Sequence, residues 1–161
     1  MARRPKIPST PALRMLTARG VEFTLHPYEY VEHGGSAASS AALGVDEHHV
    51  VKTLIFEDAE QQPLIVLMHG DRSVSAKQLA RVLGTRSTRP CAPATAERHS
   101  GYRVGGTSPF GVRRRMPVYV ERSVLALPRV WINGGARGLL VSLAPAVLTE
   151  LLAATPVEVA R

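Results

Sequence analysis

The chain has 161 residues, one cysteine and a formal charge of +7, so it is long enough for one domain with a substantial core and cannot form an intrachain disulfide or a CxxC metal site. It contains no run of about 18 apolar residues and no apolar stretch after its basic N-terminus, which argues against a membrane span and a signal peptide. The charge favours a polyanionic partner, and nucleic acid is favoured over anionic lipid. Alternatively, the positive charge reflects only an arginine-rich composition.

Hydrophobic periodicity, capping residues and glycine turns divide the chain into short helices and strands. Thr10 followed by Pro11 is typical of a helix start and Gly20 of a helix end, and Ser75 and Gly84 frame a later helix in the same way. The predicted helices span residues 11–19, 36–43, 76–83, 93–100 and 146–153, and Ser36 or Ser39 could cap the second of them. The predicted strands span residues 21–26, 48–56, 64–68, 117–121, 130–132, 139–143 and 157–159. We expect the second and third strands to pair antiparallel.

Lys52 lies in the middle of the strand predicted over residues 48–56, whose two alternating sets of side chains are both largely apolar. An ammonium there costs several kcal/mol unless it has a partner or opens into a cleft. With seventeen arginines and three lysines in the chain, a lysine at this place favours a site that needs a compact point charge. The alternative is a lysine that reaches solvent from an edge strand or pairs with Glu57 or Asp58.

Two pairs of adjacent glycines each precede cationic residues in the sequence. Gly105-Gly106 begin a loop that leads to three consecutive arginines, and Gly134-Gly135 follow a strand and precede Arg137. Adjacent glycines let backbone N–H groups approach a ligand or form an anion-binding nest, but by themselves they indicate nucleotide binding only weakly, because an ordinary tight turn also explains them. Together with Lys52 they suggest a cleft walled by backbone. The three arginines could attract an RNA backbone or form a solvated face.

We expect neither a metal site nor a nucleophile supplied by the protein. The six histidines show no helical ligand spacing, and His48 and His49 should face opposite ways on a strand. Cys91 lies between prolines with His99 as a possible base, but a lone cysteine near a histidine is usually incidental. No GxSxG motif is present.

The ordered set of motifs resembles the YbaK/EbsC family, freestanding relatives of the bacterial prolyl-tRNA synthetase editing domain. The similarity runs from about residue 10 to 159, through Tyr28, Val51-Lys52-Thr53-Leu54, the segment 104–111 and the segment 133–138. It implies a single compact α+β domain over residues 10–161, with a mixed, barrel-like β-sheet and helices packed outside, after a flexible basic segment 1–9. It also implies hydrolysis of mischarged aminoacyl-tRNA in the cytoplasm, best known for Cys-tRNA(Pro), with no cofactor.

Residue by residue, the resemblance implies Lys52 as the essential lysine, Thr53 as its neighbour in the pocket and Gly105 as the glycine whose backbone contacts the 3′-terminal aminoacyl-adenosine. The residues implied for substrate binding are Tyr28, Gly106, Thr107, Ser108, Pro109, Asn133, Gly134, Gly135 and Arg137. The residues expected to contact tRNA are Arg113, Arg114 and Arg115. Asn133 and Leu140 stand where YbaK has a serine and an aspartate, which bears on amino-acid preference more than on the reaction.

An aminoacyl ester is already activated, so orientation and oxyanion stabilisation can accelerate its cleavage without a catalytic triad. For cysteine, the family picture is that the substrate thiol attacks its own carbonyl and a thiolactone is released. The expected partners are aminoacyl-tRNA, with tRNA(Pro) favoured, and a prolyl-tRNA synthetase as a further candidate. Two alternatives remain: editing of another small residue such as Ala or Ser, and a non-catalytic RNA- or nucleotide-binding regulator.

Overall fold

The centre of the fold is an antiparallel pair of strands, β2 (Val50–Asp58) and β3 (Pro63–His69), in a computed structural model that describes residues 7–161. Every residue of β3 is buried, as expected of a strand covered on both faces. Lys52 lies opposite Met68 in this pair. The predicted hairpin is therefore confirmed, whereas the predicted flexible segment 1–9 lies mainly outside the described residues.

The other strands extend this pair into one mixed sheet. Its order is β1-β7-β6-β2-β3-β5-β8, and β4 pairs with β2 beside this path. The β2–β6, β3–β5 and β5–β8 pairs are parallel, and the others are antiparallel. The bounds are β1 (Thr24–Pro27), β4 (Thr88–Pro90), β5 (Val118–Glu121), β6 (Val130–Ala136), β7 (Leu139–Leu143) and β8 (Thr155–Val157).

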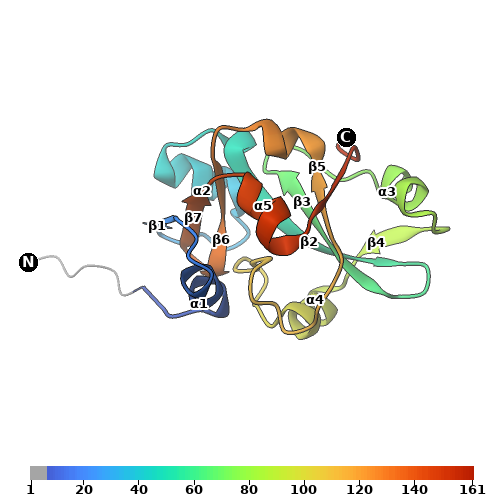
Figure 1. The fold of residues 1–161 in the computed structure, drawn as a ribbon, viewed down its shortest axis with the longest axis horizontal. Helices are drawn as coiled ribbons and strands as arrows, with labels where there is room; N and C mark the ends of the chain where they lie inside the picture. The colour runs from blue at the N-terminus through green and yellow to red at the C-terminus, as the bar shows by residue number, and fades with distance from the viewer. Residues whose placement is uncertain (1–6) are drawn as a thin grey trace, which may run out of the picture.

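Five α-helices lie outside the sheet in the described part of the chain, so the predicted α+β domain is confirmed. They are α1 (Pro11–Ala18), α2 (Gly35–Leu43), α3 (Ala76–Leu83), α4 (Pro93–Ser100) and α5 (Ala146–Leu152). Helix α1 contacts β6, α2 and α4 contact β2, and α3 contacts β4. In Figure 1, α2 and β1 lie toward one end of the molecule, and α3 and β4 toward the other. None of these helices is long and apolar enough to cross a membrane.

Side chains of β2 enter two separate hydrophobic clusters, one on each face of the sheet. Val51 and Ile55 join the larger cluster, whereas Phe56 joins a smaller one with Met68 and Leu79. This division follows from the two-residue period of a strand. Lys52, two positions along from Leu54 and four from Phe56, therefore projects on the side of the smaller cluster.

Three local predictions were wrong. His48 and His49 lie in a 3-10 turn, η1 (Glu47–His49), because the Asp46 carboxylate accepts the His48 N–H at 2.9 Å and caps that turn. Gly134-Gly135 lie within β6 at a bulge in its pairing with β7, not in a turn after a strand. The short strand β4 was not expected, since its three residues show no apolar alternation.

Candidate active site

A cavity of about 760 Å³ lies where the sheet divides beside β2. Strand β6 is in register with Val50 and Val51, and β4 is in register with Phe56–Asp58. Between these two strands, no strand of the described residues faces Lys52–Ile55 on that side of β2. The rest of the wall comes from the segment after β1, helix α2, the start of α4 and the glycine loop.

The cavity brings together many of the residues that the sequence pointed to. Those lining it are Tyr28, Lys52, Thr53, Gly105, Thr107, Asn133, Arg137 and Leu140. The other residues expected to bind substrate do not line it: Ser108, Pro109 and Gly134 are buried, and Gly106 and Gly135 line a second cavity of about 380 Å³ beside the start of α1. Ser108, for example, is fully buried, and its hydroxyl accepts the Phe110 N–H at 3.1 Å.

Lys52 is half-buried at the cavity wall, and its Nζ donates a hydrogen bond to the Arg72 carbonyl at 2.5 Å. Burial lowers the pKa of Lys52, while the negative charges of Glu47 and Asp71 act in the opposite direction. A carbonyl oxygen accepts hydrogen bonds and carries no full negative charge. Lys52 therefore presents a cation that no carboxylate neutralises by direct contact within the described residues.

The simpler explanation of Lys52, an ion pair with Glu57 or Asp58, is not what the structure shows. Glu57 accepts a hydrogen bond from Arg89 Nε at 2.6 Å. The Asp58 carboxylate accepts the backbone N–H of Gln62 at 3.0 Å and so closes the turn between β2 and β3. Both acidic residues have structural partners away from Lys52.

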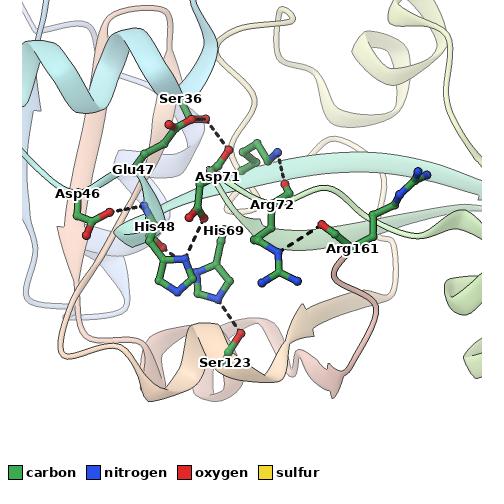
Figure 2. Close-up of polar contacts among 11 residues, drawn as sticks. Ser36, Asp46, Glu47, His48, His69, Asp71, Arg72, Ser123 and Arg161 are labelled. Carbon is green, nitrogen blue, oxygen red and sulfur yellow. Dashed lines mark hydrogen bonds and ion pairs between the residues drawn. The ribbon is translucent and has the colours of Figure 1, made fainter.

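The turn that carries the Arg72 carbonyl is fixed by a network of two histidines and Asp71, shown in Figure 2. Asp71 Oδ1 lies 2.9 Å from His48 Nδ1, and the His48 ring stacks on the His69 ring with centroids 3.7 Å apart. His69 Nδ1 must donate to the His48 carbonyl at 2.7 Å, because that oxygen can only accept. His69 Nε2 therefore accepts from the Ser123 hydroxyl at 2.7 Å.

Sequence spacing did not reveal that His48, His69 and Asp71 meet, with potential metal-ligating atoms within 4.8 Å of one another. Both ring nitrogens of His69 already have partners, and the two imidazole planes are 6° from parallel, so their in-plane lone pairs do not converge on one point. Burial lowers the pKa of His69, which favours the neutral ring. The group is better suited to hold the turn than to bind a metal.

The loop at Gly105-Gly106 requires glycine at both positions. Gly105 has φ +91°, and a Cβ there would lie 2.6 Å from the Tyr30 hydroxyl. A Cβ at Gly106 would lie 2.8 Å from the Arg137 backbone nitrogen. Arg137 Nε donates to the Val104 carbonyl at 2.9 Å, and its guanidinium lies 5.0 Å from the centre of the Tyr30 ring. The cation thus fastens the loop to the cavity rim.

Asn133 joins the two glycine segments. Its side-chain nitrogen donates to the Gly105 carbonyl at 3.3 Å, and its oxygen accepts the N–H groups of Gly135 at 2.7 Å and Ala136 at 3.1 Å. Leu140 faces Asn133 across the β6–β7 pair and is buried in the wall. At these two positions, Asn133 thus supplies a polar group that already has hydrogen-bond partners, and Leu140 supplies an apolar surface.

Tyr28 and Thr53 add two hydroxyl groups to the wall. The Tyr28 backbone N–H donates to the Gly138 carbonyl at 2.8 Å, and burial raises the pKa of its phenol, which stays protonated at neutral pH. The Thr53 hydroxyl oxygen is buried and has no hydrogen-bond partner among the described residues. Of the two hydroxyls, only that of Tyr28 is accessible to a bound molecule, because the Thr53 oxygen is enclosed by protein atoms.

Cys91 also lines the cavity, which its place between two prolines did not indicate. Its Sγ lies 3.9 Å from Glu57 Oε2, and burial and the Glu57 charge raise the pKa of the thiol. No hydrogen bond joins Cys91 to His99 in the part of the chain that the structure describes. This environment favours the thiol over the reactive thiolate. Tyr30, another unpredicted wall residue, follows Tyr28 by two positions.

Arg113, Arg114 and Arg115 are exposed and do not line the cavity. The backbone N–H groups of Arg113 and Arg114 donate to the carbonyls of Ser100 and His99, at the end of α4. Helix α4 supplies part of the cavity wall with its first residues, so these arginines are attached to the opposite end of a helix that borders the site.

A model of the family described as the aminoacyl-tRNA editing domain matches residues 33–151. The chain belongs to this family, as the resemblance predicted. It is 26% identical over 152 residues to the Enterococcus faecalis protein named "Putative Cys-tRNA(Pro)/Cys-tRNA(Cys) deacylase EbsC", covering 94% of this chain and 93% of that one.

Solved structures show the same fold. The crystal structure of hypothetical protein APE2540 is 26% identical, with a TM-score of 0.86 over 94% of this chain and 99% of that one. A structure titled as a "putative trans-editing enzyme for prolyl tRNA synthetase" is 23% identical, with a TM-score of 0.81 over 96% of this chain and 99% of that one.

Proposed function

We propose that residues 10–161 form a trans-editing enzyme that hydrolyses mischarged aminoacyl-tRNA in the cytoplasm, with Cys-tRNA(Pro) as the favoured substrate. The observation that carries the proposal is Lys52, a cation that contacts no carboxylate of residues 7–161, at the wall of a cavity large enough for an aminoacyl-adenosine end. The name of the Enterococcus relative supports the choice of Cys-tRNA.

In this mechanism the protein positions and polarises the ester and supplies no covalent nucleophile. The Lys52 ammonium stabilises the negative charge that develops on the ester carbonyl oxygen. Gly105 and its loop hold the terminal adenosine, and the Tyr28 hydroxyl orients the substrate. Cys91 takes no part, because its surroundings raise the thiol pKa.

For a cysteinyl ester, the nucleophile is the thiol of the substrate. A bond forms between the substrate sulfur and its own carbonyl carbon, and the ester bond to the ribose oxygen breaks. The thiol proton ends on that ribose oxygen, and a cyclic thiolactone leaves. Water cleaves substrates that lack a thiol, more slowly because a hydroxyl group or water is a weaker nucleophile than a thiol near neutral pH.

The cavity wall favours a small side chain of low polarity. Leu140 presents an apolar surface, and both polar atoms of the Asn133 amide have backbone partners. An apolar wall discriminates weakly between side chains that differ by one small group. Editing of Ala-tRNA is therefore the second candidate, with Ser-tRNA less favoured.

The proposed partner is tRNA(Pro), steered by Arg113, Arg114 and Arg115, which are attached to the end of α4, a helix that contributes to the cavity wall. A prolyl-tRNA synthetase is a further candidate, because it would release the mischarged tRNA in the neighbourhood of the editing enzyme.

A deacylation panel tests the function. Single-turnover rates would be measured for Cys-, Ala-, Ser- and Pro-tRNA(Pro), each divided by its spontaneous hydrolysis rate, with Cys-tRNA(Cys) reporting selectivity for the tRNA. We expect the largest acceleration for Cys-tRNA(Pro), with a thiolactone detected by mass spectrometry after rapid quench, and Pro-tRNA(Pro) spared. Absence of acceleration for every ester, with tRNA binding intact, would instead indicate a non-catalytic RNA-binding protein.

A further inference from the structure

Seven consecutive residues of β2, Val50–Phe56, line the cavity. Successive side chains of a strand point to opposite faces of the sheet, so side chains alone cannot line one cavity in this way. The strand must present its edge. The backbone N–H and C=O groups on that edge are then part of the cavity wall.

Hydrogen bonds at both ends of the β2–β3 pair show which backbone groups are already used. The Gly70 N–H donates to the Val50 carbonyl at 2.6 Å, and the Asp58 N–H donates to the Gln62 carbonyl at 3.0 Å. In an antiparallel pair the bonded residues alternate along each strand. The even-numbered residues of β2 therefore direct their backbone groups to β3.

The odd-numbered residues direct theirs to the opposite edge. The Cys91 N–H, which donates to the Ile55 carbonyl at 2.9 Å, confirms this at one end of the gap. Thr53 lies two positions further, where no strand of the described residues is in register. Its backbone N–H and C=O both point into the cavity at the place of an absent strand residue.

The absent position is a continuation of β4. Strand β4 pairs antiparallel with β2 as far as Pro90 opposite Phe56, and Cys91 extends the contact to Ile55. Continuing that register would place residue 93 opposite Thr53, but the chain leaves the sheet there because Pro93 begins α4. One residue-sized place in the sheet is thus left open.

We propose that this place binds the aminoacyl group of the substrate as if it were a residue of the absent strand, an inference that rests on the proposed function. The α-ammonium donates to the Thr53 carbonyl, and the ester carbonyl accepts the Thr53 N–H. An α-amino ester carries its nitrogen and its carbonyl at the same separation as a residue in an antiparallel ladder, so both bonds form together.

This arrangement also sets the direction of the substrate. An antiparallel partner of Thr53 runs as β4 does, so the ester end points toward Val51, beyond which β6 brings Asn133 and the Gly105 loop. The amino end points toward Cys91. The tRNA end then reaches the glycine loop, and Lys52 is the strand neighbour of Thr53 on the ester side. Recognition through the backbone does not depend on the amino-acid side chain. Contacts with the cavity walls select the side chain.

Binding of two adenosine analogues tests the inference without turnover. One carries alanine in amide linkage at the 3′ position; the other carries propionate, which is alanine without its amino group. Hydrogen exchange would be followed by NMR. In the free protein we expect the Thr53 amide to exchange faster than those of Lys52 and Leu54, and the alanyl analogue to slow it at least about ten-fold. The propionyl analogue should bind about ten-fold more weakly, since it lacks a charged hydrogen bond.

The inference is overturned if the alanyl analogue leaves Thr53 exchange unchanged, if it does not bind, or if the propionyl analogue binds equally well. Deacylation of Cys-tRNA(Pro) by the same preparation separates the two proposals. Protection of Thr53 without deacylation supports the binding mode and contradicts the proposed function. Deacylation without protection of Thr53 supports the proposed function and contradicts the binding mode.

A pair of variants gives a second test. Thr53→Pro removes the N–H that faces the cavity and leaves the bonds of β2 to β3 in place, whereas Thr53→Val changes the side chain and keeps the N–H. For folded proteins, kcat/KM on Cys-tRNA(Pro) should fall at least about ten-fold further in Thr53→Pro than in Thr53→Val. Equal losses would contradict a role of the backbone. If Thr53→Pro does not fold, the analogue measurements decide alone.

Discussion

Two opposing effects act on the pKa of the Lys52 ammonium group. Burial lowers its pKa, whereas Glu47 on η1 and Asp71 in the turn after β3 act to raise it. Its contact with the Arg72 carbonyl requires it to donate. The acidic residues near Lys52 thus act at a distance, and they favour its charged form.

Asp71→Asn should therefore move the alkaline limb of the pH profile of kcat/KM to lower pH. The pKa of Asp71 lies below its ordinary value, so the residue is ionised at neutral pH, and removing its charge lowers the pKa of Lys52 further. Less of the protein then carries protonated Lys52 at alkaline pH. Asp46→Asn is the control, because Asp46 caps η1 without being among the charges that act on Lys52. An alkaline limb that stays in place in Asp71→Asn would refute this coupling.

Cys91→Ala should deacylate Cys-tRNA(Pro) at near the wild-type rate. The raised pKa of the thiol and its place beside Glu57 leave it a poor nucleophile. The measurement is the single-turnover rate with the thiolactone quantified by mass spectrometry. A folded but inactive Cys91→Ala would identify a thiol enzyme, and free cysteine without a thiolactone trace would identify water as the nucleophile.

Among the helices and strands, the features that depend on residues close together in the sequence were predicted correctly. Thr10 and Ser75 cap α1 and α3 as expected, because a cap bonds a residue three positions away. The buried run of β3 and its pairing with β2 were likewise predicted. By contrast, Ser36 does not cap α2; its hydroxyl lies 2.9 Å from Glu47 Oε1 and 3.0 Å from the Gly70 carbonyl oxygen, and its one proton is donated to either of them. Partners that lie far away in the chain took precedence over the local role.

The residues of the candidate site also fall into those that local sequence could reveal and those that depend on distant contacts. Lys52 and Gly105 could be singled out because a cation in an apolar strand and paired glycines are visible in the sequence. The contact between His48 and His69 could not, since it joins η1 to the end of β3. The gap opposite Thr53 depends on where β4 leaves the sheet, and β4 has no local signature.

Gly105→Ala should reduce kcat/KM about ten-fold or more. A Cβ at this positive φ would collide with Tyr30, so the loop has to shift at the cavity rim, and displacements of about 1 Å can have large effects on rate. Gly20→Ala is a matched control: Gly20 has φ +68° with nothing within 4 Å of an added Cβ. It should lose about 1 kcal/mol of stability and keep its activity. Equal activities in the two folded variants would place the loop outside the site.

For the whole molecule, the net charge of +7 has a proposed use in tRNA binding. Replacing Arg113, Arg114 and Arg115 together by Ala should weaken tRNA binding and flatten its salt dependence, by roughly 0.7 to 0.9 in the log–log slope per lost phosphate contact. The single-turnover rate at saturation should change little.

A control of equal charge loss replaces the exposed residues Arg81, Arg86 and Arg122, none of which lines the cavity. Binding would be measured over a range of salt concentrations. If both triple variants flatten the slope equally, the effect is one of overall charge. If neither does, Arg113 to Arg115 form a solvated face.

In the proposed mechanism, the cavity beside β2 catalyses deacylation through Lys52. It is tested most directly by the single-turnover rate of Lys52→Ala on Cys-tRNA(Pro), measured beside its unfolding free energy. We expect loss of most of the acceleration over spontaneous hydrolysis, with the unfolding free energy changed by no more than about 1 kcal/mol, because losing one hydrogen bond is offset by no longer burying a cation. A Lys52→Ala protein that deacylates at the wild-type rate, or that is unfolded at room temperature, would contradict it.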